Sequence, residues 1–210
     1  MLEYKIEKDP YDADEVLFAG KLKRSIEPGL TVLTGCNGTG KTTILHVVND
    51  AYKYSDSHKI FRWTGLTDKG IAKQRSLDMQ SFDILASLAF SSEGEEINTN
   101  IGLLATRIGN FVRSNDDKDI IMLIDGLDSG LSIDNIIETK DFFMELLIPD
   151  IEKHGHNCYV IISANEYELA AGEKCIDARS GKEMYFESYE EYRKYILDSR
   201  KKKDRRSMSR

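Results

Sequence analysis

Residues Gly35–Thr43 read GCNGTGKTT, and their types and spacing fit the pattern GxxxxGK[ST] without a mismatch. Glycines let the backbone turn tightly enough for successive N–H groups to point at a single anion. In this pattern the lysine reaches the outer phosphates of a nucleotide, and the hydroxyl residue after it helps to hold Mg²⁺. We therefore expect a phosphate-binding loop formed by Gly35, Cys36, Asn37, Gly38, Thr39, Gly40, Lys41, Thr42 and Thr43.

The elements on either side of this loop have the character that such a loop requires. The apolar run LTVLT precedes it, and apolar residues at helical spacing follow it between Thr43 and Tyr54. A strand before the glycines and a helix after them distinguish a phosphate-binding loop from a chance glycine turn. The positive N-terminal end of that helix would add to the attraction for phosphate.

A second acidic segment, IIMLID, ends on Asp125. Its apolar run Ile120–Ile124 is typical of a central parallel strand that is covered on both faces. A carboxylate at the end of such a strand can bind Mg²⁺, directly or through water, opposite the Thr42 hydroxyl. The alternative is a strand-terminal aspartate that caps a turn.

The rest of the chain alternates apolar strand patterns with helical ones. CYVIIS (residues 158–163) predicts another buried strand, and a helix is expected from Asn135 to Leu147, ending before Pro149. The alternation predicts an α/β fold with a mainly parallel central sheet flanked by helices. The alternating segment EYKIEK near the N-terminus would add an antiparallel edge, whereas residues 55–80 are polar and favour no element.

The segment LIDGLDSGLS resembles the Walker B region of ABC-type ATPases, usually LLDEPTSGLD. FSSEGEE (residues 90–96) is similar to the signature segment of SMC- and RecF-like relatives, and VIISANEYELA (residues 160–170) to their switch segment. The motifs occur in the order of that family. The resemblance implies a P-loop NTPase fold of the ABC-ATPase type over residues 1–199, without coiled-coil arms, and the cofactors ATP and Mg²⁺.

The resemblance also implies a partner subunit. In this family the signature of one subunit closes on the ATP held by another, so Ser91, Ser92 and Gly94 would contact ATP across a homodimer. From the residues alone, Ser92 and Glu95 also fit a capping box that begins a helix. Gln80 is the candidate for the glutamine that links the metal to a partner surface, and Gln74 competes for that role.

Two positions depart from the family pattern. The glutamate that orients the attacking water is replaced by Gly126, and the switch histidine by Asn165, or by Ala164 if the alignment slips by one. Asp128 could supply the missing carboxylate, or it could simply stabilise a turn before Ser-Gly. We expect catalytic roles, if any, for Asp128 and Asn165, and a weak or partner-activated ATPase. A non-hydrolysing clamp, or a site completed by a partner in trans, is the alternative.

The composition of the chain indicates its expected cellular location and the character of its C-terminal end. The net charge is −7, three cysteines occur without a CxxC pair, and the start lacks an apolar signal segment, so we expect a cytoplasmic protein without membrane contact. Residues 200–210 carry seven basic residues against one acidic residue and are expected to be a disordered tail. That tail could instead contact nucleic acid or an acidic partner.

The function expected from the sequence is an ATP-binding protein that dimerises around ATP and drives or regulates a partner such as a nuclease or another effector. The family context favours nucleic-acid maintenance or defence against foreign DNA, which is an analogy of fold. A small-molecule or nucleotide kinase and a transporter ATPase subunit are further alternatives. The kinase would need an arginine-bearing lid, for which residues 55–80 offer only Arg62 and Arg75.

Overall fold

A six-stranded mixed sheet forms the centre of the protein in the computed structural model, which describes residues 1–6, 22–64, 104–128 and 131–208. Neighbouring strands of the sheet pair in parallel except at one end, where β7 and β8 are antiparallel. This confirms the predicted α/β class with a mainly parallel sheet. In spatial order the strands are β4 (His58–Thr64), β5 (Asp119–Asp125), β6 (Cys158–Ser163), β3 (Gly29–Thr34), β7 (Cys175–Asp177) and β8 (Glu183–Met184).

The apolar strands supply both faces of the sheet because successive side chains point in opposite directions. In β5, Ile121 and Leu123 pack with α1 (Lys41–Tyr52), whereas Met122 and Ile124 pack into the core on the other face. Both side-chain sets are almost fully buried. The continuous apolar run that predicted a central strand is therefore explained by two separate cores.

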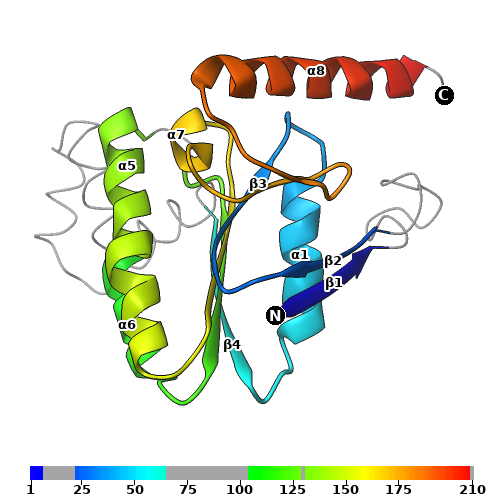
Figure 1. The fold of residues 1–210 in the computed structure, drawn as a ribbon. Helices are drawn as coiled ribbons and strands as arrows, with labels where there is room; N and C mark the ends of the chain where they lie inside the picture. Colours follow the sequence, from blue (N-terminus) through cyan, green and yellow to red (C-terminus); the bar gives the residue numbers. More distant parts are fainter. Residues whose placement is uncertain (7–21, 65–103, 129–130, 209–210) are drawn as a thin grey trace, which may run out of the picture.

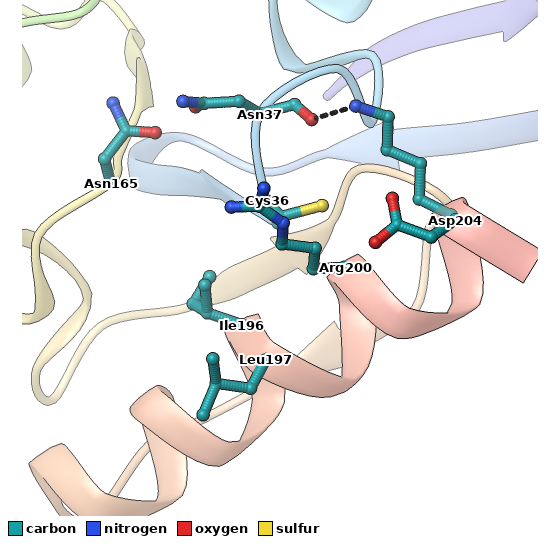
Figure 2. A pocket seen from close by; sticks show the side chains of 9 residues that line it. Cys36, Asn37, Asn165, Ile196, Leu197, Arg200 and Asp204 are labelled. Atoms are coloured by element: carbon teal, nitrogen blue, oxygen red, sulfur yellow. Dashed lines mark hydrogen bonds between the residues drawn. The ribbon is translucent and has the colours of Figure 1, made fainter.

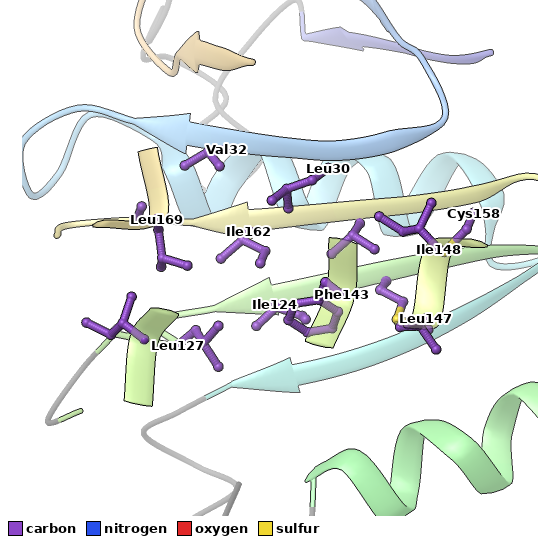
Figure 3. Packing of buried hydrophobic residues seen from close by; sticks show 14 of the residues in the cluster. Leu30, Val32, Ile124, Leu127, Phe143, Leu147, Ile148, Cys158, Ile162 and Leu169 are labelled. Carbon is purple, nitrogen blue, oxygen red and sulfur yellow. The ribbon is translucent and has the colours of Figure 1, made fainter. Parts of the chain in front are cut away.

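Helices on one face and α1 on the other enclose the sheet (Figure 1). The first core lies against a helical run made of α5 (Ile133–Asp141), the π-helix η1 (Phe142–Leu147) and α6 (Ile148–Lys153), and residues 104–113 are also helical there. Figure 3 shows Phe143 and Leu147 of η1 directed at Ile124, Ile162 and Leu30 of the sheet. Helices therefore cover the sheet on both faces.

The predicted antiparallel N-terminal edge is only partly right. β1 (Leu2–Ile6) and β2 (Leu22–Ile26) do pair antiparallel, but they form a separate two-stranded sheet. Their apolar residues Leu2, Tyr4 and Ile6 pack with α1 rather than extending the central sheet. The alternating pattern of β1 identified a half-buried strand, but it contains no information about which sheet the strand joins.

The helix that was predicted to end before Pro149 instead continues through it to Lys153. Proline lacks the N–H that an α-helix needs, and its ring would press on the carbonyl four residues earlier. The π-helical turn before it relieves this conflict: the N–H of Ile148 reaches the carbonyl of Phe143, five residues back. The prediction was wrong because it treated proline as a stop, whereas a wider turn accommodates it.

Two further segments differ from the sequence-based expectations. β4, within the polar segment for which no element was predicted, is the end strand beside β5. Residues 200–208, expected to be disordered, continue α8 (Tyr189–Met208), which follows the short helix α7 (Tyr167–Ala170) and the strands β7 and β8. α8 lies across the edge of the sheet at which β3 ends (Figure 1). None of the helices within the described ranges is long and apolar enough to span a bilayer.

Candidate functional site

Parallel strands bring the predicted site residues to one edge of the sheet. The carboxyl ends of β5, β6 and β3 lie next to one another, and each is followed by a segment that the sequence analysis selected. Loops at this edge of a parallel sheet are the usual location of a binding site. The topology therefore explains how residues 35–43, 125–128 and 165 come together.

The glycine-rich loop between β3 and α1 has the backbone that its sequence predicted. Gly35, Gly38 and Gly40 have φ values of 139°, 78° and 99°, a region that other residues rarely adopt. Gly35 has a second reason to lack a side chain, since an added Cβ would lie 2.5 Å from Thr39 Oγ1. That hydroxyl donates to the Cys36 carbonyl at 2.8 Å and closes the loop on itself.

Lys41, the first residue of α1, is only 8% exposed, and its Nζ donates to the Gly35 carbonyl at 2.5 Å. Burial lowers the pKa of this ammonium, and the nearby Cys36, Asp128 and Asp125 oppose the shift. An ammonium has three donors, and a buried charge is costly unless it is paired. The arrangement leaves a buried cation at the loop whose natural complement is an anion.

Thr42 and Asp125 meet as the metal hypothesis requires. Thr42 Oγ1 donates to Asp125 Oδ2 at 2.8 Å, although the residues are 83 positions apart in the chain. The other oxygen of Asp125 accepts a short hydrogen bond from the Ser163 hydroxyl, which in turn accepts the N–H of Gly126 at 2.9 Å. Ser163 therefore fixes the orientation of the carboxylate.

These oxygens fit Mg²⁺ by their chemistry. Mg²⁺ in nucleotide sites is usually held by one or two protein oxygens together with phosphates and water, rather than by a complete protein cage. Among the described residues, no group of three or more His, Cys, Asp or Glu side chains is placed to hold a metal. A hydroxyl and an oriented carboxylate beside a phosphate loop match the Mg²⁺ preference for hard oxygen ligands.

The structure places the two candidate catalytic residues against each other. Asp128 is 5% exposed, and its Oδ2 accepts the backbone N–H groups of Asn165 at 2.5 Å and Glu166 at 2.8 Å. The Asn165 side-chain amide also reaches Asp128 Oδ1 at 3.4 Å. Asp128 thus joins the segments that follow β5 and β6, a structural role that differs from the local turn before Ser-Gly considered in the sequence analysis.

At the position where ABC-type ATPases have a glutamate, Gly126 has a φ of 65°.

Some residues near the site were not selected from the sequence. One is the carboxylate Glu166, whose pKa is raised by burial and by the charges of Asp128 and Glu168. Ser163 was missed as well. Its signal was present, because it ends an apolar strand and parallel strands end at the same edge. Ser199 on α8, whose hydroxyl accepts the N–H of Cys36 at 3.4 Å, gave no local signal.

Gln80, Ser91, Ser92 and Gly94 lie outside the described residues, so their predicted contacts with ATP remain sequence-based predictions. The same holds for Gln74 and for residues 129–130 of the SGL segment. The described part of the site therefore comprises the phosphate loop, the Thr42–Asp125 pair and the Asp128–Asn165 connection.

Comparison with models of known protein families finds no match for the chain. Comparison with curated protein sequences finds no match either. The functional assignment therefore depends on the geometry of these residues.

Proposed function

We propose that this protein binds a nucleoside triphosphate together with Mg²⁺ at the loop formed by residues 35–43, and that it is an ATPase head of the ABC type. The observation that carries the proposal is the 2.8 Å contact between Thr42 Oγ1 and Asp125 Oδ2, beside the buried ammonium of Lys41. A cation, a hydroxyl and a carboxylate are the groups that a magnesium triphosphate needs. Their presence beside three positive-φ glycines has no simple explanation in packing.

Each residue has a defined part in this proposal. Backbone N–H groups of the loop and the Lys41 ammonium bind the phosphates, while Thr42 and Asp125 would hold Mg²⁺. When bound, Mg²⁺ neutralises negative charge on the phosphate oxygens. Ser163 keeps the Asp125 carboxylate in place through its short hydrogen bond. The segment that joins β3 to α1 provides the rigid frame for these contacts.

Hydrolysis is the weaker part of the expected activity. Gly126 has no side chain to activate water, and both oxygens of Asp128 already accept hydrogen bonds from the Asn165–Glu166 segment. An asparagine cannot act as a base near neutral pH. These observations favour slow or partner-activated turnover, and they support a non-hydrolysing ATP-dependent clamp as the second candidate function.

The proposal includes the assembly that the sequence motifs imply. Two copies would close around ATP through the segment of residues 90–96 and would act on a protein partner, such as a nuclease or another effector. We place the protein in the cytoplasm on the basis of its cysteine usage. Nucleic acid is a further possible ligand through the basic end of α8.

The magnesium contact is tested by replacing Thr42 with valine, which keeps the shape of the side chain and removes the hydroxyl. ATP affinity is measured with Mg²⁺ and with EDTA, in the wild type and in the Thr42→Val variant. We expect Mg²⁺ to strengthen ATP binding by about tenfold or more in the wild type, and by much less in the variant. Equal Mg²⁺ dependence in both proteins would exclude Thr42 as a metal contact.

A further inference from the structure

The C-terminal helix α8 is firmly attached to the body of the protein along its first half. Tyr192 is 3% exposed and packs edge-on against Phe186, with ring centroids 5.0 Å apart. The Tyr195 hydroxyl donates to Asp177 Oδ1 at 2.8 Å. Because an α-helix is stiff over a few turns, these anchors fix the direction in which its basic second half extends.

The face of α8 that carries Tyr195 also contacts the phosphate loop further along the helix. Ser199 lies one turn beyond Tyr195, and its hydroxyl accepts the N–H of Cys36 at 3.4 Å in a buried position. One turn further, Lys203 Nζ donates to the Asn37 carbonyl at 2.8 Å, the dashed bond in Figure 2. α8 is therefore part of the wall of the candidate site.

A cavity of about 420 Å³ remains between the loop and the helix, which is large enough for part of a small ligand. Its lining comes from three segments, namely the loop, the segment after β6 and α8: Gly35, Cys36, Asn37, Asn165, Ile196, Leu197, Arg200, Lys203 and Asp204. The loop, where phosphates are expected, forms one side, and two cations of α8 lie on the other. Asp204 places one carboxylate in the same cavity.

Arg200 is the cation best placed to act on a ligand here. Lys203 already donates to Asn37, whereas no hydrogen bond or ion pair of Arg200 is found within the described part of the chain. Figure 2 shows its side chain extending from α8 toward the loop at Cys36. A guanidinium presents a rigid fork of donors that matches two oxygens of a phosphate group.

We propose that this cavity receives the terminal phosphate of the bound nucleoside triphosphate and that Arg200 contacts it from the same chain. The inference rests on the proposed nucleotide-binding function and deepens it. Lys41 would hold the phosphates from within the loop, and Arg200 would hold the outermost phosphate from the opposite wall. A diphosphate lacks that group, so Arg200 makes the site selective for the triphosphate.

The test compares ATP and ADP affinity in the full-length wild type, in Arg200→Ala and in Arg193→Ala, measured by calorimetry with Mg²⁺ present. Arg193 is the matched control, because it is an exposed arginine on the same helix that does not line the cavity. We expect Arg200→Ala to weaken ATP binding by about 10- to 100-fold, the effect of losing a charge-assisted contact. ADP binding should change by less than about twofold on the same scale.

The Arg193→Ala variant should bind both nucleotides as the wild type does, and both variants should melt at the wild-type temperature because the two side chains are exposed. Unchanged ATP affinity in Arg200→Ala, or an equal loss for ATP and ADP, would overturn the inference and leave the proposed function standing. Tighter ATP binding in Arg200→Ala would also overturn it, since α8 would then obstruct the site. A wild type that binds neither nucleotide would remove the proposed function and this inference together.

Discussion

Lys41 carries a positive charge that the fold has largely removed from water, and burial lowers its pKa below the ordinary 10.5. Below the lowered pKa the lysine is charged in both the folded and unfolded states, so burial of the charge reduces stability there. As the pH rises through the lowered pKa, the folded state loses this proton before the unfolded state does, and the penalty has disappeared once the pH exceeds 10.5. A bound phosphate offsets the same penalty at neutral pH, and we therefore expect the ligand to stabilise the protein.

Replacing Asp128 tests whether this residue has a structural role or a catalytic one. Replacing it with alanine removes the acceptor of the part-buried N–H groups of Asn165 and Glu166, and each hydrogen bond lost costs about 0.5–1.5 kcal/mol. Urea denaturation should therefore show a clear loss of stability in Asp128→Ala. The exposed Asp117 offers a control, because its replacement should change stability by less than about 0.5 kcal/mol.

Phosphate release measured on the same Asp128 variant separates the two roles. Our interpretation is that Asp128 holds two segments together and does not act on water. The fold-loss in the rate of phosphate release should therefore be no larger than the fold-loss in ATP affinity. Wild-type stability combined with abolished turnover would instead identify Asp128 as the residue that positions water.

At the scale of elements, the loop between β3 and α1 can be tested through its glycines. Gly35→Ala introduces a Cβ that would lie 2.5 Å from Thr39 Oγ1, in addition to the strain of a φ of 139°. Gly155→Ala has a comparable positive φ of 86°, but nothing lies within 4 Å of its Cβ. The control should therefore lose only the strain energy, about 1–2 kcal/mol.

We expect Gly35→Ala to lower ATP affinity by about tenfold or more, because the Thr39–Cys36 closure of the loop must open. Gly155→Ala should leave ATP affinity unchanged. Titration of both variants with Mg-ATP gives the comparison, and equal affinities would show that the shape of the loop does not determine nucleotide binding.

The elements that could be predicted from sequence are those whose pattern is local. α1 and the strands β3, β5 and β6 were identified by apolar runs and helical spacing, and the glycines located the turn between β3 and α1. β4 was missed because its apolar residues Ile60, Phe61 and Trp63 are mixed with charged ones inside a polar segment, and its pairing with β5 is a tertiary contact. The basic end of α8 was expected to be disordered because its contacts with Cys36 and Asn37, 163 and 166 residues away, leave no local signal.

The residues of the candidate site also divide into those specified by a local pattern and those that depend on tertiary contacts. Lys41, Thr42 and Asp125 were selected correctly as neighbours because a motif and the end of a parallel strand specify their positions. Ser163 and Ser199 came to the site through sheet order and helix docking, which depend on the whole fold. Residues that act through tertiary contacts are thus the ones that a single sequence predicts least well.

For the whole molecule, the central question is whether nucleotide binding controls assembly. We expect light scattering to show twice the monomer mass with Mg-ATP, and the monomer mass with ADP or without nucleotide. The physical reason is that a triphosphate shared between two subunits adds a contact that a diphosphate lacks. A mass that does not respond to ATP would remove the dimer from the proposal while leaving nucleotide binding intact.

The most direct test of the account is calorimetric titration of Mg-ATP into the wild type and into Lys41→Met. Methionine keeps most of the side-chain volume and removes the buried charge, so the variant should fold with a melting temperature at or above that of the wild type. The account predicts one ATP per wild-type chain and a loss of affinity of about 100-fold in the variant. No binding to the wild type, or equal affinity in the two proteins, would contradict it.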